Sequence, residues 1–305
     1  GLVRFSSLPD LLRIGRAVAL AAATVALVAY LAADGAHLFA GVRQANSFGT
    51  IAALSLRDGS LRTLCDVKGA ALYYVTSLAY DPATHTLFYT ADNNDWRDLC
   101  TVDTESGETH RLMRDCRIGD LVFSPHDGCL WGVRHFNGIS TLVRIAPPYR
   151  EWSQVHSWPY GQDPYDIDLS PDGRWLSFSL SEISGRQSLQ LAELAALEAG
   201  LGQSRELFDF GSTVPANFVF APGGRYLYGS SYYTGVSNIW RYDLAADSMQ
   251  ACSNTETGLF RPLPVTEDSL VVFRYSGEGF VPAWLQARPL ADLPAVTFLG
   301  QQVIE

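Results

Sequence analysis

The fold is decided by the stretch Ile167-Asp168-Leu169-Ser170-Pro171-Asp172-Gly173-Arg174-Trp175-Leu176-Ser177-Phe178. An apolar run ends there in a Ser-Pro-Asp-Gly turn, and alternating apolar residues follow the turn. Asp, Pro and Gly provide the backbone dihedrals of a tight turn. Alternation with period two places successive side chains on opposite faces of a strand. The stretch therefore predicts two antiparallel strands joined by a short turn.

The same pattern returns along the chain. Clear copies lie at residues 121–131 and 218–228, and residues 78–88 carry it with one extra turn residue. Weaker copies lie around Asp34-Gly35 and Glu267-Asp268, which brings the total to six. A recurring unit of short strands, roughly 40 to 50 residues long, is typical of a β-propeller blade.

Each repeat continues beyond its first two strands. A second alternating run and a last short strand follow, as at residues 99–102 and 110–113. The sequence therefore predicts an all-β fold, a six-bladed β-propeller of four-stranded antiparallel blades, over residues 24–300. Only residues 192–202, rich in Ala, Leu and Glu, interrupt the rhythm, and they predict one short surface helix.

The Ser-Pro-Asp-Gly-x-x-Leu core resembles the TolB-type WD40-like propeller repeat of bacterial proteins. Two departures are Gly223, which stands where the repeat has Asp, and the last copy, which lacks Pro-Asp-Gly. That family includes partner-binding periplasmic proteins and the propeller domains that precede prolyl-oligopeptidase-type catalytic domains. The resemblance is specific for the fold; it implies a bacterial cell-envelope, periplasmic location and leaves the function open.

Composition limits the classes of function. The chain has 305 residues, of which 47% are hydrophobic, so one closed repeat domain with a large core is expected. Its formal net charge of -10 argues against nucleic acid as a partner, because phosphates would be repelled. The five cysteines form no close pair and their spacings do not suit zinc. Neither a metal nor a cofactor is predicted.

The amino-terminal segment allows two interpretations. Residues 17–33 carry no charge and follow Arg13 and Arg16, as in a signal or membrane helix. Residues 25–31 also stand where the first strand of blade 1 is expected. We assign residues 1–23 to a helical or membrane/signal-like segment, the only part expected to contact a membrane. Residues 301–305 would begin a C-terminal extension, and further domains are expected in the same polypeptide.

Candidate binding residues come from one face of the predicted propeller. In four-stranded blades, the loops between strands two and three share a face with the linkers that join successive blades, around the mouth of the central channel. Tyr, Trp and Arg beside amides are typical of recognition surfaces. The predicted ligand-binding residues are Arg43, Asn94, Trp96, His135, Asn137, Trp158, Tyr160, Arg186, Tyr232 and Tyr233. The alternative is that they are ordinary loop residues and aromatics that close the core.

Catalytic motifs are not found in the sequence. It contains no Gly-x-Ser-x-Gly elbow and no His-Glu-x-x-His pair. His85 and His126 occupy turns on the face opposite His135, so the three cannot share a metal. Asp166 and Asp168 alternate along the innermost strand and are expected to be solvated carboxylates that line the channel. No catalytic residue is predicted, and the chain itself is not expected to be an enzyme.

These observations favour a non-catalytic module that binds or scaffolds a protein or peptide partner, within a larger bacterial envelope protein. One alternative is an accessory propeller that gates substrate access to a hydrolase or peptidase domain outside this chain. Another is a metal-dependent propeller lyase, which the scattered histidines favour least.

Overall fold

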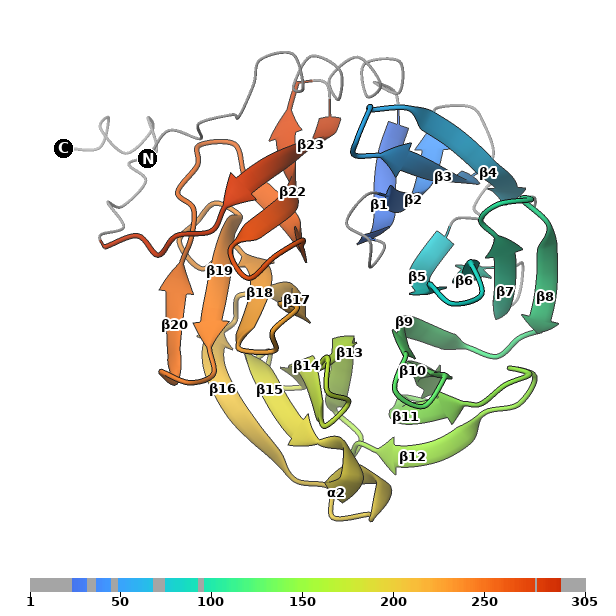
Figure 1. Cartoon of the computed structure of the whole chain (residues 1–305). Coiled ribbons are helices and arrows are strands. Elements are labelled where there is room, and N and C mark those ends of the chain that lie inside the picture. The colour runs from blue at the N-terminus through green and yellow to red at the C-terminus, as the bar shows by residue number, and fades with distance from the viewer. Residues whose placement is uncertain are drawn as a thin grey trace.

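The computed structural model describes residues 24–31, 37–44, 49–67, 75–92, 96–277 and 279–291, which form six antiparallel sheets arranged in a ring (Figure 1). Every sheet is built from strands that follow one another in the chain. Five sheets have four strands, and the sixth has three within the described ranges. The predicted six-bladed propeller is therefore confirmed.

The blades follow one another around the ring in chain order (Figure 1). Blade 1 contains β1 (Thr24–Leu31), β2 (His37–Gln44), β3 (Gly49–Ser55) and β4 (Leu61–Val67). Blade 2 contains β5 (Val75–Asp81), β6 (Thr86–Asp92), β7 (Arg97–Asp103) and β8 (Thr109–Met113). Blade 3 contains β9 (Ile118–Ser124), β10 (Cys129–Phe136), β11 (Ile139–Ile145) and β12 (Ser153–Ser157).

The second half of the ring repeats this arrangement. Blade 4 contains β13 (Gln162–Leu169), β14 (Trp175–Glu182), β15 (Gln187–Glu193) and β16 (Ser204–Gly211), with helix α2 (Leu194–Glu198) between its last two strands. Blade 5 contains β17 (Pro215–Phe220), β18 (Tyr226–Ser231), β19 (Asn238–Asp243) and β20 (Ser248–Ala251). Blade 6 contains β21 (Leu259–Pro264), β22 (Ser269–Ser276) and β23 (Gly279–Gln286).

The Ser-Pro-Asp-Gly motif forms the turn between the first two strands of blade 4, as predicted. The Ser170 hydroxyl donates to Asp172 Oδ1 at 2.5 Å, and the same oxygen accepts the Arg174 N–H at 3.1 Å. Ser170 Oγ in turn accepts the Trp175 N–H at 2.9 Å. Gly173 has φ +70°, a left-handed conformation that glycine adopts without a steric penalty. The motif thus satisfies the polar groups of a turn that joins adjacent strands.

Both ends of the chain were open questions in the sequence. Residues 24–31 form strand β1, so this part of the apolar stretch is extended and belongs to blade 1. Residues 1–23 lie outside the described ranges, as do residues 301–305. The domain boundaries therefore stay predictions. Within the described ranges, no helix has the length and hydropathy needed to span a bilayer.

Hydrophobic layers between neighbouring blades hold the ring together. Strand β10 contributes to two of them, because its side chains alternate. Leu130 packs with Phe88 and Leu99 of blade 2, whereas Trp131 packs with Phe178 of blade 4. The same alternation directs Arg134 and Phe136 toward blade 2, and His135 toward blade 4.

Helix α2 lies at the end of strand β15. It was expected on the surface, and two of its leucines, Leu194 and Leu197, are in fact buried in the layer between blades 3 and 4. The helix therefore covers the outer part of that layer while its other side chains face solvent.

Candidate functional site

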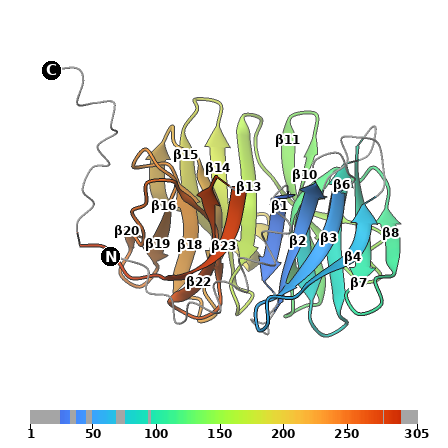
Figure 2. The same ribbon diagram turned by 90° about the horizontal axis from the view of Figure 1, so that it is seen from above.

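One rim of the ring, the channel-mouth face, gathers the loops between the second and third strands and the linkers between blades (Figure 2). Backbone hydrogen bonds tie several linkers to neighbouring loops. The His135 N–H donates to the Arg117 carbonyl at 3.1 Å, and the Ile183 N–H donates to the Gly161 carbonyl at 2.8 Å. Side chains from different blades are thereby held side by side at one rim.

Exposed hydrophobic side chains concentrate on this face. Among the described residues, the structure exposes twelve large hydrophobic side chains. Eight belong to the channel-mouth face: Trp96, Phe136, Tyr160, Ile183, Val214, Tyr232, Tyr233 and Tyr275. Tyr160 and Ile183 are the most open of these, at 73% and 81% exposure. A concentration of exposed hydrophobic side chains on one face is typical of a surface that binds another molecule.

Arginines are interleaved with the aromatics on the blade 2 and blade 3 side. The guanidinium carbon of Arg117 lies 3.1 Å from the Trp96 ring centroid and 4.8 Å from that of Phe136. The guanidinium carbon of Arg134 lies 4.8 Å from the Phe136 ring centroid and 4.7 Å from the Trp152 ring centroid. We call these five residues the arginine–aromatic ladder. Cation–π contacts stabilise each guanidinium over an aromatic face.

His135 belongs to a polar cluster between blades 3 and 4. Its Nδ1 lies 3.0 Å from Ser140 Oγ and 3.3 Å from Asp163 Oδ1, and the Ser140 hydroxyl donates to Asp163 at 2.5 Å. Since Ser140 uses its proton on Asp163, Nδ1 of the neutral ring is the donor and Nε2 is an acceptor. Burial lowers the pKa of His135, which favours this neutral form.

This cluster differs from a catalytic triad. In a triad the histidine bridges the serine and the aspartate with its two different nitrogens. Here Ser140 and Asp163 meet the same nitrogen, and Ser140 is only 4% exposed. The arrangement fixes the orientation of the His135 ring and provides a hydrogen-bond acceptor, without an accessible nucleophile.

The innermost strands carry polar residues into the channel at β-bulges. Asp120, Asp166, Asn217 and Arg261 have φ between 46° and 53°, and the pairing register of each strand shifts beside them. The Asn217 N–H donates to Asp166 Oδ2 at 2.8 Å, and its side-chain Nδ2 donates to Oδ1 at 3.0 Å. We call these four residues the channel collar.

Burial dominates the electrostatics of the collar. It raises the pKa of Asp120 to about 7, with the charge of Asp166 as a second cause, and it also raises the pKa of Asp166. Burial lowers the pKa of Arg261, while both carboxylates oppose that shift. The collar thus places two acidic groups and one cation in a confined polar environment.

Asp166 and Asp168 were expected to be solvated carboxylates that line the channel; both are only partly exposed, and they also have structural partners. Both accept hydrogen bonds from strand β17: Asp168 Oδ2 accepts the Phe220 N–H at 2.7 Å, and Asp166 binds Asn217. Burial raises the pKa of Asp168 to about 7. The two carboxylates therefore connect blades 4 and 5.

Most of the predicted binding residues lie at the channel-mouth face. The structure places six of them there: Trp96, His135, Asn137, Tyr160, Tyr232 and Tyr233. Asn137 adopts φ 52° in the tight turn between β10 and β11. Arg43 lies near the end of β2, and Asn94 falls outside the described ranges. No contact in the structure tests whether any of them binds a ligand.

Two predicted residues have structural partners instead of open surfaces. Trp158 was expected on the rim, but it is 6% exposed and packs edge-on against Phe178 in the layer between blades 3 and 4. Arg186 is engaged within blade 4 by Glu206 at 2.7 Å, Asp209 at 3.0 Å and Glu182 at 3.5 Å. The Trp158 indole is buried because it packs against His156 and Phe178 in the layer between blades 3 and 4.

Sequence reasoning missed three of the four collar residues, all but Asp166, and four of the five ladder residues, all but Trp96. The collar had a signal: Asp120, Asp166 and Asn217 each stand five positions before the turn proline, in otherwise apolar strands. Arg117, Arg134 and Trp152 had none, because their proximity depends on how blades 2 and 3 pack. Among the described residues, no group of three or more His, Cys, Asp or Glu could hold a metal ion.

Comparisons with known proteins support the fold. No family model and no curated protein sequence matches the chain. TolB from Acinetobacter baumannii is similar in structure, with a TM-score of 0.60 and 12% identity over 74% of this chain and 53% of that chain. The chain therefore spans about half of that TolB chain.

Two further solved structures are similar. An oligogalacturonate lyase in complex with manganese has a TM-score of 0.59 and 12% identity, over 85% of this chain and 76% of that one. A chain of the nidogen/laminin complex has a TM-score of 0.58 and 16% identity, over 74% of this chain and 79% of that one. At these identities the likeness is one of fold.

Proposed function

We propose that this propeller binds a protein or peptide partner on its channel-mouth face. The observation that carries the proposal is the placement of eight of the twelve exposed large hydrophobic side chains on that one rim. Tyr and Trp provide large, rigid contact areas at interfaces, and such anchors contribute most of the binding free energy. The remaining rim residues, His135 and Asn137 among them, would supply hydrogen bonds around the anchors.

The channel gives this surface a polar centre. Asp120, Asp166 and Arg261 line the confined space inside the aromatic rim. A partner segment that reaches the channel would replace water as the hydrogen-bond partner of these three side chains. The aromatic side chains of the rim would bind the side chains on either side of that segment. The mechanism is surface complementarity, and it involves no bond-making step.

The setting we propose is a larger protein of the bacterial cell envelope. The support is the repeat pattern together with the structural likeness to TolB. A propeller that gates a hydrolase or peptidase domain elsewhere in the polypeptide stays an alternative prediction. It would use the same face, because a gate also lies at a channel mouth.

The test compares two pairs of substitutions with similar exposure. The first, Tyr160→Ala with Tyr232→Ala, removes side chains that are 73% and 55% exposed on the channel-mouth face. The control, Leu201→Ala with Leu61→Ala, removes side chains that are 67% and 50% exposed at the opposite rim. Each tagged protein is used to capture proteins from an envelope extract of the source bacterium, with quantitative mass spectrometry.

We expect a protein enriched by the wild type and by the control pair to be reduced about tenfold or more with the channel-mouth pair. Equal capture by all three proteins would contradict the proposal, and so would loss with the control pair alone.

A further inference from the structure

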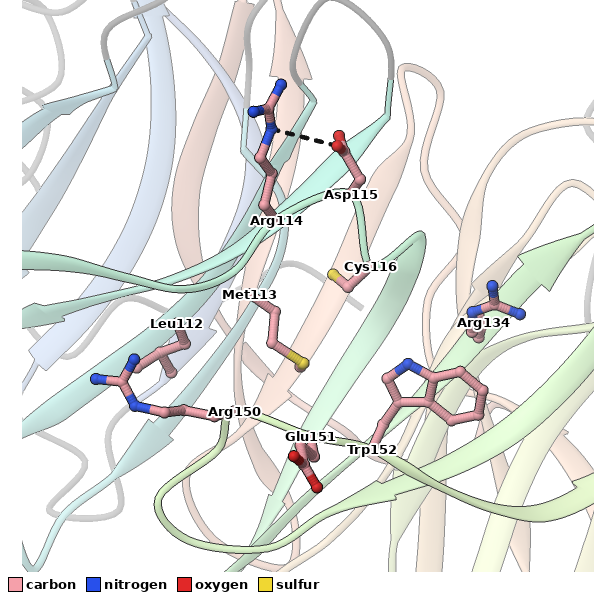
Figure 3. A pocket seen from close by; sticks show the side chains of 9 residues that line it. All are labelled: Leu112, Met113, Arg114, Asp115, Cys116, Arg134, Arg150, Glu151 and Trp152. Atoms are coloured by element: carbon pink, nitrogen blue, oxygen red, sulfur yellow. Dashed lines mark ion pairs between the residues drawn. The ribbon is translucent and has the colours of Figure 1, made fainter.

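A groove of about 560 Å³ runs between blades 2 and 3, beside the arginine–aromatic ladder (Figure 3). Strand β8 and the linker after it form one wall, with Met113 and Cys116. Residues from β10 and from the segment before β12 form the other wall, with Arg134, Arg150 and Trp152. Three of its lining residues are arginines and two are acidic, Asp115 and Glu151, in a protein whose formal net charge is -10.

Of the three arginines that line the groove, Arg114 pairs with Asp115 at 3.2 Å, whereas Arg134 and Arg150 have no carboxylate partner within the described residues. Arg186, Arg225 and Arg144 each form close ion pairs with carboxylates. Within the described part of the chain, Arg117, Arg134 and Arg150 form no ion pair, and Arg134 Nε is buried without a hydrogen-bond partner. An unpaired buried donor on a cation destabilises the free protein, and an acceptor supplied from outside would remove that cost.

Stacking determines which part of each guanidinium is available. Phe136 and Trp152 flank the Arg134 guanidinium, and Trp96 and Phe136 flank that of Arg117. With aromatic rings nearby, the N–H groups in the guanidinium plane are the remaining binding positions. A carboxylate matches that edge, since its two oxygens accept two parallel N–H bonds.

From this geometry we infer that the groove binds an extended acidic peptide segment of a partner protein. Its Asp or Glu carboxylates bind Arg134 and Arg150, and its neighbouring apolar side chains pack on Met113 and Trp152. The site is distinct from the channel-mouth face, and it does not depend on the function proposed for that face. The groove adds a preference for acidic partner segments, which the channel-mouth face alone does not supply.

A peptide fits this groove better than an acidic oligosaccharide. Sugars bind to the open faces of aromatic rings, whereas both neighbours of Phe136 in the ladder are guanidinium groups, and Arg134 also lies over Trp152. Met113 and Cys116 in the wall instead suit an aliphatic side chain.

The test selects peptides from a random dodecapeptide phage library on the full chain. Selected sequences are expected to carry Asp or Glu beside an apolar residue. The binding of one such synthetic peptide, followed by fluorescence anisotropy, should weaken about tenfold in Arg134→Gln and in Arg150→Gln. It should also weaken at high salt. Arg150 is exposed, so its substitution does not affect the core.

The control is Arg174→Gln, which removes the same charge. Arg174 also lies over a tryptophan, 5.7 Å from the Trp175 ring, but it belongs to blade 4 and pairs with Glu193. Because each substitution removes one positive charge, a general charge effect on peptide binding would be equal in all three variants. Equal losses, or selected peptides without acidic residues, would overturn the inference. Displacement of the peptide by a uronate trimer at lower concentration than by the free peptide would also overturn it.

Failure here is distinguishable from failure of the proposed function. The Tyr160→Ala and Tyr232→Ala pair should leave acidic-peptide binding unchanged, whereas Arg150→Gln should leave capture through the channel-mouth face unchanged.

Discussion

At the scale of single residues, burial shifts the inward-facing carboxylates toward their protonated, neutral form. Burial raises the pKa of Asp168 from its ordinary value of 3.8 to about 7, although its Oδ2 accepts the Phe220 N–H. The folded chain therefore binds this proton more tightly than the unfolded chain. The resulting stability is fully present below about pH 4 and is lost as the pH rises toward about 7.

This shift predicts that Asp168→Asn stabilises the protein at pH 8 by about 2 kcal/mol. The amide oxygen can still accept the Phe220 N–H, and no charge is buried. Urea unfolding at pH 4.5, 6 and 8 should give a smaller loss of stability with rising pH for the variant than for the wild type.

The control for this measurement is Asp172→Asn. Asp172 is a turn carboxylate whose pKa is lowered, chiefly by its hydrogen bond with Ser170, so it titrates below this pH range. His135 and His156 have lowered pKa values and act in the opposite direction, but equally in all three proteins. An unchanged pH dependence in Asp168→Asn would contradict the assignment.

At the scale of elements, β-bulges determine which polar side chains of the innermost strands face the channel. Each bulge turns one polar residue into the channel, and the side chain of Asp166 then reaches the next bulge at Asn217. A non-glycine residue with positive φ is strained, least so for Asn and Asp. Three of the four collar positions hold one of these two residues.

We expect Asn217→Val to destabilise the protein by about 2 kcal/mol more than Asn217→Gly. Both substitutions remove the bond from Nδ2 to Asp166, but only valine opposes φ 53° with a branched side chain. Chemical denaturation of the two variants measures the difference. Equal free energies of unfolding for the two variants would mean that the positive φ at residue 217 does not restrict which side chain this position tolerates.

Features that depend on a few adjacent residues were predicted correctly from the sequence, whereas features that depend on packing between distant residues were not. The turn at Ser170 and Gly173 depends on four adjacent residues, and the structure has it as expected. The bulges break period-two alternation, so the orientation of Asp166 did not follow from the pattern. In the same way, Trp158 looked like a rim residue because its burial depends on the packing of blade 4.

At the scale of the whole molecule, the two surfaces proposed for binding are the channel-mouth face and the groove between blades 2 and 3. Repeats predicted the six blades because each blade is one local unit that packs on its neighbours. The arginine–aromatic ladder joins side chains from Trp96 to Trp152, across two blades, and no single repeat contains it. The surfaces proposed for binding therefore involve contacts between repeats, which the pattern within a single repeat does not predict.

Hydrogen exchange of the chain, alone and with its captured partner, tests the central claim most directly. We predict protection in the segments of the channel-mouth face, including residues 158–161 and 231–238, and unchanged exchange in the turns of the opposite rim, such as residues 170–174. Protection of the opposite rim, with the channel-mouth segments unchanged, would contradict the claim that this face binds the partner.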